Sequence, residues 1–334
     1  MDYRYLGRSA LQVSPLCLGA MMFGGPTDEP TSRRIVDKAR AQGINFIDTA
    51  DGYNDGKSEE VVGRAIRDHR HHWVLATKFG HRMTTAPNEG GQSRKWIFQD
   101  VEASLRKLGT DYIDLLYFHK ADIHAPFEEG LRAIQDLMAQ GKVRYYGVSN
   151  FKGWRIAEIC RAADAVGMDR PVASQPLYNM VDRLSEVEQL PAAGHYGLGV
   201  VPYSPLARGV LTGKYLKDAA PPEGSRVARG DARIKQTEWR AESVEIAQAV
   251  AKHAADKGVS TVAFAIAWVL KNRFVSAAIA GPRTEEQWDS YLPALDVTLG
   301  PEDEAFADDL VPPGHASTPG YTDPAYPIEG RQVR

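Results

Sequence analysis

Ile44-Asn45-Phe46-Ile47-Asp48-Thr49-Ala50-Asp51-Gly52-Tyr53 is the stretch that decides the fold. Its first four residues are mainly apolar and predict a short buried strand, which ends at Asp48. The turn-formers Asp51 and Gly52 then lead to Tyr53, and the run 58–63 that follows predicts the start of a helix. In a parallel α/β protein the carboxyl end of the sheet is where chemistry is done. A carboxylate and a phenol at that end therefore indicate a functional site.

The composition is that of an ordinary globular protein. Hydrophobic residues make up 43% and charged residues 25% of 334 residues, and the net charge of -3 excludes a basic footprint for nucleic acid or an acidic membrane surface. The N-terminus has no apolar core of signal-peptide length, and the longest apolar run, 259–270, is shorter than the roughly 20 residues that span a bilayer. We expect a cytoplasmic protein. Cys17 and Cys160 are expected as buried free thiols, with a disulfide between them as the alternative.

Apolar runs alternate with helical patterns along most of the chain. Strands are expected at 16–19, 45–48, 74–78, 113–119, 145–149, 172–175, 200–203 and 275–280. Helices are expected at 31–42 (with Thr31 as N-cap), 58–67, 96–108, 127–140, 154–166, 184–193, 259–270 and 284–292. Such alternation means crossover connections and a parallel sheet, and eight units predict an α/β fold of the (β/α)8 TIM-barrel type. The alternative is an open doubly wound sheet, but no Gly-x-Gly-x-x-Gly turn follows any of the strands.

Other segments fall outside this alternation. Residues 3–13 alternate around Gly7 and predict a β-hairpin that precedes the barrel. A long connection, 204–240, is rich in Gly, Pro and charge, and a further helix is expected at 241–257. The tail 312–334 has little periodicity and is expected on or near the barrel mouth. We expect residues 1–334 to form one barrel domain.

Four polar residues are expected to meet at the mouth of the barrel. Asp48, Lys78 and His119 end three consecutive strands, and Tyr53 lies on the loop after the first of them. A phenol has a pKa near 10, and a nearby ammonium stabilises the phenolate. A carboxylate fixes the ammonium, and a histidine can orient a carbonyl oxygen by hydrogen bonding. The four together predict catalytic residues that protonate an oxygen while hydride reaches the adjacent carbon.

Each residue has a simpler explanation when taken alone. A lone Asp at a strand end is usually a helix cap, and a lone Tyr on a loop is usually amphipathic cover. A hydrolase that pairs Asp48 with Glu59 is a rival, although Glu59 is expected to face away from Asp48. No metal site is expected, because no carboxylate or Cys spacing accompanies His69, His71 and His72.

The chain resembles the aldo-keto reductases over nearly its whole length. The matching motifs are 48–53, 56–59, Lys78, 115–119, 147–151, 175–179, 203–214 and 281–287. The stretch Tyr203-Ser204-Pro205-Leu206-Ala207 resembles the branch that contains bacterial sugar and aldehyde reductases and the potassium-channel β subunits. The resemblance implies an oxidoreductase that reduces aldehydes or ketones to alcohols, reversibly, with a nicotinamide dinucleotide bound without a Rossmann unit.

The residues are consistent with such a cofactor. Ser149, Asn150 and Gln175 suit a carboxamide, and Tyr203 offers an aromatic face for the nicotinamide ring. Arg283 can bind a 2′-phosphate with its planar fork, which favours NADPH over NADH. The full set of expected cofactor residues is Gly19, Met21, Asp48, Ser149, Asn150, Gln175, Tyr203, Ser204, Leu206, Arg208, Gly209, Lys214, Gly281, Arg283 and Gln287.

The expected substrate is a small carbonyl compound. Its pocket would be lined by Met22, Phe23, Tyr53, Phe79, Trp96, His119 and Lys120. Such Met-rich and aromatic walls suit an apolar or mixed compound, and Arg82, Arg94 and Lys120 could bind a phosphate on it. The rival function is a nucleotide-sensing binding subunit that keeps the cofactor site but turns over slowly. The expected state is a monomer or a homo-oligomer.

Overall fold

The structure, a computed structural model, describes residues 1–81 and 86–327. The chain divides into two compact units. The barrel unit consists of residues 1–177, 188–203 and 272–290, and the second unit consists of residues 178–187, 204–271 and 291 to the C-terminus. That all 334 residues form one domain, with the tail 312–334 near the mouth, stays a prediction.

Eight parallel strands form one sheet within the described residues, in the order β10-β3-β4-β5-β6-β7-β8-β9. They are β3 (Leu16–Gly19), β4 (Phe46–Asp48), β5 (Val74–Phe79), β6 (Ile113–Phe118), β7 (Val143–Ser149), β8 (Ala173–Gln175), β9 (Gly199–Val200) and β10 (Ala278–Ala280). The two edges of the sheet join, because Val200 N donates to Phe274 O (3.0 Å) and Ser276 N donates to Val200 O (2.8 Å). The predicted (β/α)8 barrel is therefore confirmed.

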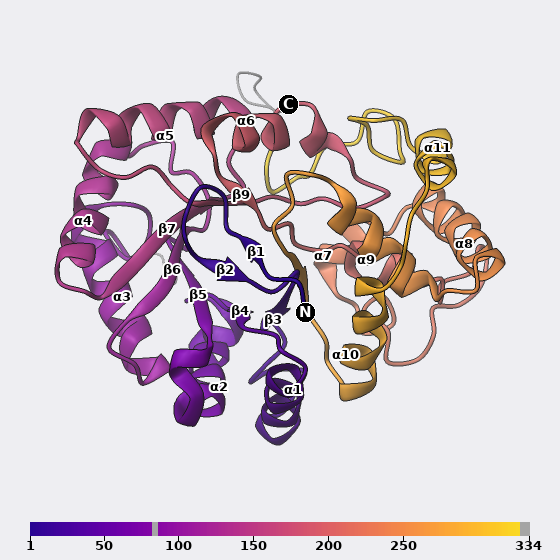
Figure 1. Cartoon of the computed structure of the whole chain (residues 1–334), viewed down its shortest axis with the longest axis horizontal. Helices are drawn as coiled ribbons and strands as arrows, with labels where there is room; N and C mark the ends of the chain where they lie inside the picture. Colours follow the sequence, from indigo (N-terminus) through magenta and orange to yellow (C-terminus); the bar gives the residue numbers. More distant parts are fainter. Residues whose placement is uncertain (82–85, 328–334) are drawn as a thin grey trace. The chain divides into compact units, whose positions relative to one another are not determined.

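Helices connect the strands of the barrel unit, and Figure 1 shows α1 to α5 following one another around the outside of the strands. The helices of this unit are α1 (Glu29–Ala41), α2 (Lys57–Ile66), α3 (Arg94–Leu108), α4 (Phe127–Ala139), α5 (Gly153–Ala165) and α6 (Gln189–Tyr196), and α10 (Glu285–Tyr291) ends at the unit's boundary. Two 3₁₀ segments, η1 (Tyr53–Gly56) and η2 (Arg67–His72), flank α2.

Two helix predictions were wrong in detail. The first helix begins at Glu29, not after Thr31, because the Asp28 carboxylate caps it by accepting the backbone N–H of Thr31. Pro30 lies in its first turn, where a missing N–H costs nothing. The helix expected at 184–193 is instead a 3₁₀ turn, η3 (Leu184–Glu186), followed by α6.

An N-terminal hairpin fills one end of the barrel. Strands β1 (Arg4–Tyr5) and β2 (Gln12–Val13) pair antiparallel, as predicted. Leu6 and Val13 are fully buried in one cluster with strand residues such as Phe46. Arg8 N donates to Gly197 O (2.9 Å), just before β9 begins. The hairpin therefore contacts the amino end of a strand, which leaves the carboxyl ends for a site.

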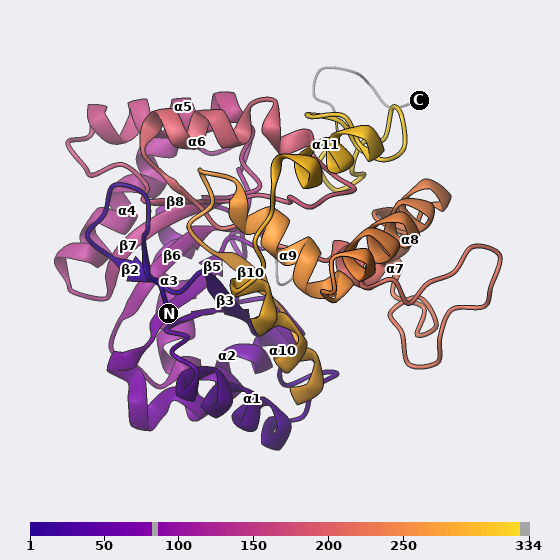
Figure 2. The same cartoon turned by 45° about the vertical axis from the view of Figure 1, so that its right-hand side comes forward.

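The second unit is mainly helical. Its elements are η3, η4 (Ala207–Thr212), α7 (Ala232–Gln236), α8 (Ala241–Asp256), α9 (Thr261–Lys271), η5 (Leu292–Leu295) and α11 (Pro301–Leu310). Figure 2 shows α8 beside α9, and the irregular stretch between η4 and α7 as a long loop. The described tail is tied into this unit, since Ser317 N donates to Val181 O (2.9 Å) and the Arg240 guanidinium stacks on the Tyr321 ring (3.8 Å).

The contact between α2 and α3 depends on a glycine. A Cβ atom at Gly63 would overlap the backbone carbonyl of Leu108. A backbone group cannot move aside as easily as the end of a flexible side chain. We predict that Gly63→Ala lowers the free energy of unfolding by about 1–3 kcal/mol, although alanine normally favours a helix by about 1 kcal/mol over glycine. Urea unfolding followed by circular dichroism measures this. Glu60→Ala, on an exposed position of the same helix, is the control and should change stability by less than about 0.5 kcal/mol. Equal effects of the two substitutions would contradict the packing argument.

Candidate active site

A buried ion pair lies at the carboxyl ends of two neighbouring strands. Asp48 ends β4, Lys78 lies on β5, and both side chains are almost fully buried. Lys78 Nζ donates to Asp48 Oδ1 and to Thr49 O (2.8 Å), and Gln175 Nε2 donates to Asp48 Oδ2 (2.9 Å). Burial alone would lower the pKa of Lys78, but Asp48 and Tyr53 outweigh it and raise this pKa to about 12. Lys78 is therefore a fixed cation at neutral pH.

Tyr53 reaches the same cation. Its hydroxyl lies 3.3 Å from Lys78 Nζ, and Nζ lies 4.9 Å from the centre of its ring. Burial raises the pKa of Tyr53, Lys78 opposes this, and the net pKa is above the ordinary value. The sequence-based argument thus had the sign of the lysine's effect right but omitted desolvation. The phenol is protonated at neutral pH, and the ammonium beside it can stabilise a phenolate.

His119 directly follows β6 and faces Tyr53. The two rings are 5.9 Å apart and nearly perpendicular. Burial, and then the positive charge of Lys78, hold the pKa of His119 well below its usual range. The imidazole is therefore neutral, which suits a hydrogen-bonding group rather than a proton source. A second histidine, His81, lies with its ring 4.3 Å from that of His119, and sequence reasoning missed it although it follows Lys78 by three residues.

The loop that carries Tyr53 is held in a constrained conformation. Asn54 (φ 50°) and Asp55 (φ 56°) adopt left-handed backbone angles, which cost energy except for glycine. Asn54 Nδ2 donates to Met21 O (2.9 Å) and Phe23 O (2.8 Å), so the loop after β3 and the Tyr53 loop hold each other. Asn54 is a positioning residue that the sequence analysis did not identify.

The expected carboxamide site forms a connected rim. Ser149 ends β7 opposite Gln175 of β8, and Ser149 Oγ donates to Gln175 O (3.0 Å). Asn150 Nδ2 donates to His119 O (2.9 Å), and Tyr203 OH donates to Asn150 Oδ1 (2.8 Å), which fixes the Tyr203 ring. These polar groups and one anchored aromatic ring adjoin His119 and Asp48. This donor set fits a nicotinamide carboxamide.

The residues expected to cover the pyrophosphate lie in the second unit, on a loop with unusual backbone angles. Ser204, Ala207, Arg208 and Gly209 all have positive φ, and Gly209 leaves room for the Lys214 side chain beside it. Leu206 is largely buried. Non-glycine residues in this conformation cluster at functional sites. The observation fits a loop shaped to receive an anion.

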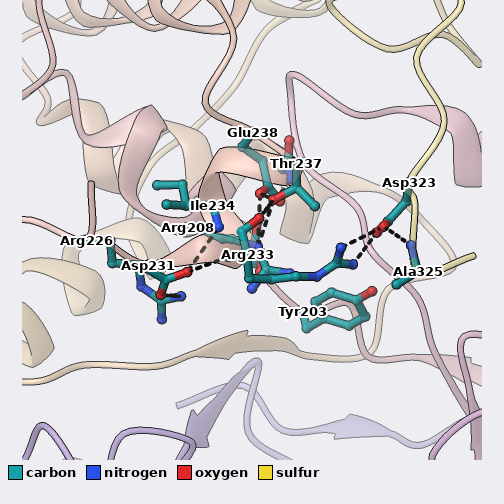
Figure 3. Close-up of polar contacts among 12 residues, drawn as sticks. Tyr203, Arg208, Arg226, Asp231, Arg233, Ile234, Thr237, Glu238, Asp323 and Ala325 are labelled. Atoms are coloured by element: carbon teal, nitrogen blue, oxygen red, sulfur yellow. Dashed lines mark hydrogen bonds and ion pairs between the residues drawn. The ribbon is translucent and has the colours of Figure 1, made fainter. Parts of the chain in front are cut away.

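Arginines gather near that loop, as Figure 3 shows. Arg208 Nε donates to Glu238 Oε2 (2.9 Å) and to Thr237 Oγ1 (3.2 Å). Burial, followed by repulsion from Arg208, lowers the pKa of Arg226, which also lies 3.6 Å from Asp231. Crowded cations favour a bound anion. Sequence analysis missed Arg226 because the connection 204–240 has no periodic pattern.

After β10, the loop 281–284 leads into α10. Gly281 and Gly19 allow close approach, since a Cβ on Gly19 would lie 2.7 Å from the Ile279 side chain. Gln287 Oε1 accepts the backbone N–H of Arg283 (2.8 Å), and Thr284 Oγ1 accepts that of Gln287 (3.3 Å). Gln287 thus has a capping function here in addition to its expected cofactor role.

The profile of the aldo/keto reductase family matches residues 15–311. The chain belongs to the aldo/keto reductase family.

Proteins similar to this chain are named as oxidoreductases or as potassium channel subunits. It is 38% identical to the uncharacterized oxidoreductase YrpG of Bacillus subtilis, over 96% of this chain and 98% of the relative. It is 38% identical to a probable voltage-gated potassium channel subunit beta of Arabidopsis thaliana, over 89% and 92%. It is 34% identical to the aldo-keto reductase AMT2 of Alternaria alternata, over 94% of each chain. Family membership supports an oxidoreductase that acts on carbonyl compounds with a nicotinamide cofactor.

The residues proposed for the pocket of this aldo/keto reductase occupy different environments. Phe23 and Phe79 are fully buried, and Phe79 packs on Phe118 with ring centres 4.8 Å apart. Met22 is largely buried, Lys120 is exposed, and Trp96 lies on α3. Arg94 pairs with Asp136, and Arg82 lies outside the described residues. Their roles in substrate binding stay predictions.

The residues of the alternative hydrolase site, and two of the histidines considered for a metal site, contact other groups in the structure. Glu59 accepts from Thr77 Oγ1 (2.7 Å) and Lys107 Nζ (3.3 Å), whereas Asp48 pairs with Lys78, so the two carboxylates of the hydrolase alternative have separate partners. His71 Nδ1 lies 3.0 Å from the Tyr112 hydroxyl, and His72 Nε2 lies 2.8 Å from Ile44 O.

Cys17 and Cys160 are both buried free thiols, as predicted. Over residues 1–81 and 86–327, no helix is long and apolar enough to cross a membrane.

Removing the cation should expose the energetic cost of the buried carboxylate. We predict that Lys78→Met destabilises the fold by about 3–5 kcal/mol, because Asp48 is left buried without its counter-ion. The loss should be smaller at pH 5.5 than at pH 8. An unpaired Asp48 has a folded pKa raised above its unfolded value, and stability is then lost as pH rises through the folded pKa. Chemical unfolding at both pH values measures this.

The matched control for this substitution is Lys38→Met. Lys38 pairs with Asp289 at 2.6 Å on the surface, where an ion pair contributes about 0–1 kcal/mol. Asp48→Asn combined with Lys78→Met should recover part of the lost stability. A Lys78 variant as stable as the Lys38 variant would show that Asp48 is not held as a charge.

Proposed function

We propose that the protein is an NADPH-dependent reductase that converts aldehydes or ketones to alcohols, reversibly, with Tyr53 as general acid. The observation that carries this is the Tyr53 hydroxyl lying 3.3 Å from the buried Lys78 ammonium, beside a neutral His119. Membership of the aldo/keto reductase family supports the reaction class. A small-molecule carbonyl compound is the substrate class that follows.

Tyr53, Lys78 and Asp48 together carry out the proton transfer. Tyr53 donates its phenolic proton to the carbonyl oxygen, and Lys78 stabilises the phenolate that remains. Asp48 keeps Lys78 in place, and the pKa of about 12 keeps it charged. In the reverse direction the phenolate takes the proton back from the alcohol. Because the site is buried, these charges act on one another with little screening.

His119 orients the substrate rather than protonating it. An imidazole whose pKa lies well below the usual range stays neutral at pH 7, and a neutral imidazole with hydrogen on Nε2 can donate to a carbonyl oxygen. Two donors, the phenol and the imidazole, then fix the oxygen and polarise the carbonyl carbon.

Several groups of this chain would hold the cofactor. A nicotinamide dinucleotide supplies the hydride when bound. Ser149, Asn150 and Gln175 would bind its carboxamide, and Tyr203 would stack on its ring. Arg208, Arg226 and Lys214 would neutralise phosphates, and Arg283 would bind the 2′-phosphate that distinguishes NADPH. Gly19, Met21, Ser204, Leu206, Gly209, Gly281 and Gln287 would complete this site.

The role of Tyr53 can be tested by deleting one oxygen atom. Tyr53→Phe should lower kcat for reduction of a carbonyl panel by about 10²–10⁴-fold, because the general acid is lost. The Kd for NADPH, measured by quenching of protein fluorescence, should stay within about twofold. Tyr5→Phe, at a residue 60% exposed in the hairpin, is the control for a tyrosine-to-phenylalanine change. Turnover of Tyr53→Phe at the wild-type rate would refute the assignment.

Cofactor preference provides a separate test. Arg283→Gln should weaken NADPH binding by about 10–100-fold and NADH binding by less than about threefold, because a charge-assisted contact contributes roughly 1.5–3 kcal/mol. Fluorescence titration of both nucleotides measures this, with Arg33→Gln, an exposed arginine of α1, as the control. Equally weakened binding of NADPH and NADH would mean that Arg283 does not bind the 2′-phosphate.

A nucleotide-sensing binding subunit is the second candidate function. It is favoured by two relatives named as probable voltage-gated potassium channel subunits beta, which match 89% of this chain. Such a protein would bind NADPH but turn over slowly with every carbonyl compound. Steady-state rates over a broad panel of aldehydes and ketones distinguish the two functions.

A further inference from the structure

The backbone that carries His119 and Lys120 is held by hydrogen bonds from neighbouring segments. His119 N donates to Phe79 O (3.1 Å), and Asn150 Nδ2 donates to His119 O (2.9 Å). On the next residue, Gln92 Nε2 donates to Lys120 O (2.5 Å), and Gln92 is almost fully buried. A side chain on a fixed backbone loses less conformational freedom when it binds a ligand. The base of Lys120 is therefore fixed directly beside the imidazole that is expected to orient the carbonyl.

Within the described part of the chain, the exposed Lys120 ammonium has no acidic partner. The nearest acidic residue along the sequence, Asp122, instead accepts the backbone N–H of His124 (3.0 Å). The other lysine of the site, Lys78, differs in this respect, because Asp48 neutralises it. The positive charge of Lys120 is thus available to a ligand.

His81 brings a second polar group to His119. The two imidazole rings are 4.3 Å apart and nearly perpendicular, with an angle of 84°. His81 also lies against the turn before Tyr53, since a Cβ atom on Gly52 would lie 3.7 Å from the His81 ring. The ring is half-buried, and none of the described residues forms a hydrogen bond with its nitrogens. An imidazole in this position can donate a hydrogen bond to an oxygen of a bound compound.

The charge of Lys120 acts on both imidazoles. Burial, followed by Lys120 and Lys78, lowers the pKa of His81. Burial, followed by Lys78, His81 and Lys120, holds the pKa of His119 well below its usual range. Both rings are therefore neutral at pH 7, and Lys120 is the charged group that they adjoin besides the paired Lys78. A single anionic group at this place can pair with Lys120 and accept a hydrogen bond from His81.

The apolar residues expected around the substrate present little surface. Phe23 is 0%, Phe79 is 1% and Met22 is 7% exposed. A substrate held mainly by apolar contact needs more apolar surface than these side chains offer. Lys120 is exposed and His81 is half-buried, so both are more accessible than the three apolar residues. The accessible groups beside His119 therefore favour a polar compound.

We propose that the substrates of this site carry an anionic group, a carboxylate or a phosphate ester, in addition to the carbonyl, and that Lys120 and His81 bind this group. The assignment rests on the proposed carbonyl reduction and deepens it, because it names the substrate class. Lys120 supplies the charge and His81 a hydrogen bond, while Tyr53 and His119 contact the carbonyl oxygen. The anionic group takes no part in the chemical step, so these contacts lower KM more than they change kcat.

Pairs of substrates that differ in charge provide the test. Succinic semialdehyde is compared with its methyl ester, and glycolaldehyde phosphate with glycolaldehyde, in reduction by the full-length protein with NADPH. We expect kcat/KM for the anionic member of at least one pair to exceed that of its neutral partner by about tenfold, mainly through KM. The pair that shows this preference distinguishes a carboxylate from a phosphate. The preference should weaken as salt concentration rises, because the ammonium is exposed. Equal values within both pairs would overturn the proposal.

Variants of the two binding residues assign the preference to them. Lys120→Gln should lower kcat/KM for the preferred anionic substrate about tenfold and change that of its neutral partner by less than about twofold. Lys120→Arg keeps the charge and should keep the preference. His81→Phe retains an aromatic ring against His119 but removes both nitrogens, and should reduce the preference by about threefold. A preference that survives unchanged in Lys120→Gln would contradict the assignment.

The matched control is Lys142→Gln. Lys142 directly precedes β7, so it lies at the amino end of the barrel, where it pairs with Glu102. This substitution removes the same charge from the opposite end and should leave the preference for the anionic substrate unchanged. An equal loss in Lys142→Gln and Lys120→Gln would show that only the net charge of the protein matters, which would refute a specific contact.

Binding without turnover separates this proposal from the proposed function. The alcohol products of both pairs are titrated into protein loaded with NADPH, a combination that cannot react, and binding is followed by ligand-observed NMR. We expect the anionic alcohol of the preferred pair to bind about tenfold more tightly than its neutral partner, and Lys120→Gln to bind both equally. If the anionic alcohol binds through Lys120 but no carbonyl compound is reduced, the proposed function is wrong and the anion site stands. If carbonyl compounds are reduced without preference for an anion, the proposed function stands and the anion site is wrong.

Discussion

The buried pair of Lys78 with Asp48 is the interaction on which the rest of the site depends. Burying either charge alone would cost several kcal/mol, so each is stable in the barrel only because the other is present. Neighbouring strands bring the two side chains together, since Asp48 ends β4 and β5 lies beside it in register. The barrel thus supplies the geometry, and the ion pair supplies a permanent positive charge at its mouth.

Burial and that charge together set the protonation states of Tyr53 and His119. The charge opposes the burial that raises the pKa of Tyr53, and it adds to the burial that lowers the pKa of His119. The consequence is a protonated phenol next to a neutral imidazole. One group can give a proton and the other can only orient, so two similar-looking donors have different roles. The loop that carries Tyr53 is held by Asn54 in a conformation with positive φ, which fixes the phenol relative to the ammonium.

A second layer of polar groups surrounds the first. Gln175 contacts Asp48, Asn150 contacts the backbone of His119, and Asp51 Oδ1 lies 3.9 Å from His119 Nδ1. In the second unit, Arg208 is already paired with Glu238, so any anion that binds this arginine must compete with or rearrange an existing ion pair. The barrel unit therefore holds the groups that suit chemistry, and the second unit holds arginines that suit phosphate.

The sequence by itself determined the number and kind of strands, the hairpin, and the positions of Asp48, Tyr53, Lys78 and His119 at strand ends. These features are local: an apolar run, a turn signal and the residue that follows the run all lie within a few positions of one another. Helix starts were less certain because Asp28 and Thr31 are both good caps, and only the backbone path decides between them.

Only the tertiary structure decided the partners and the protonation states. Asp51 meets Asp100, Glu59 meets Thr77 and Lys107, and Arg226 crowds Arg208, and none of these contacts follows from spacing along the chain. The pKa of Tyr53 also depends on how completely the barrel excludes water, which no short motif encodes. Burial and long-range pairing are properties of the folded chain. They turn a recognisable set of residues into a site with defined charges.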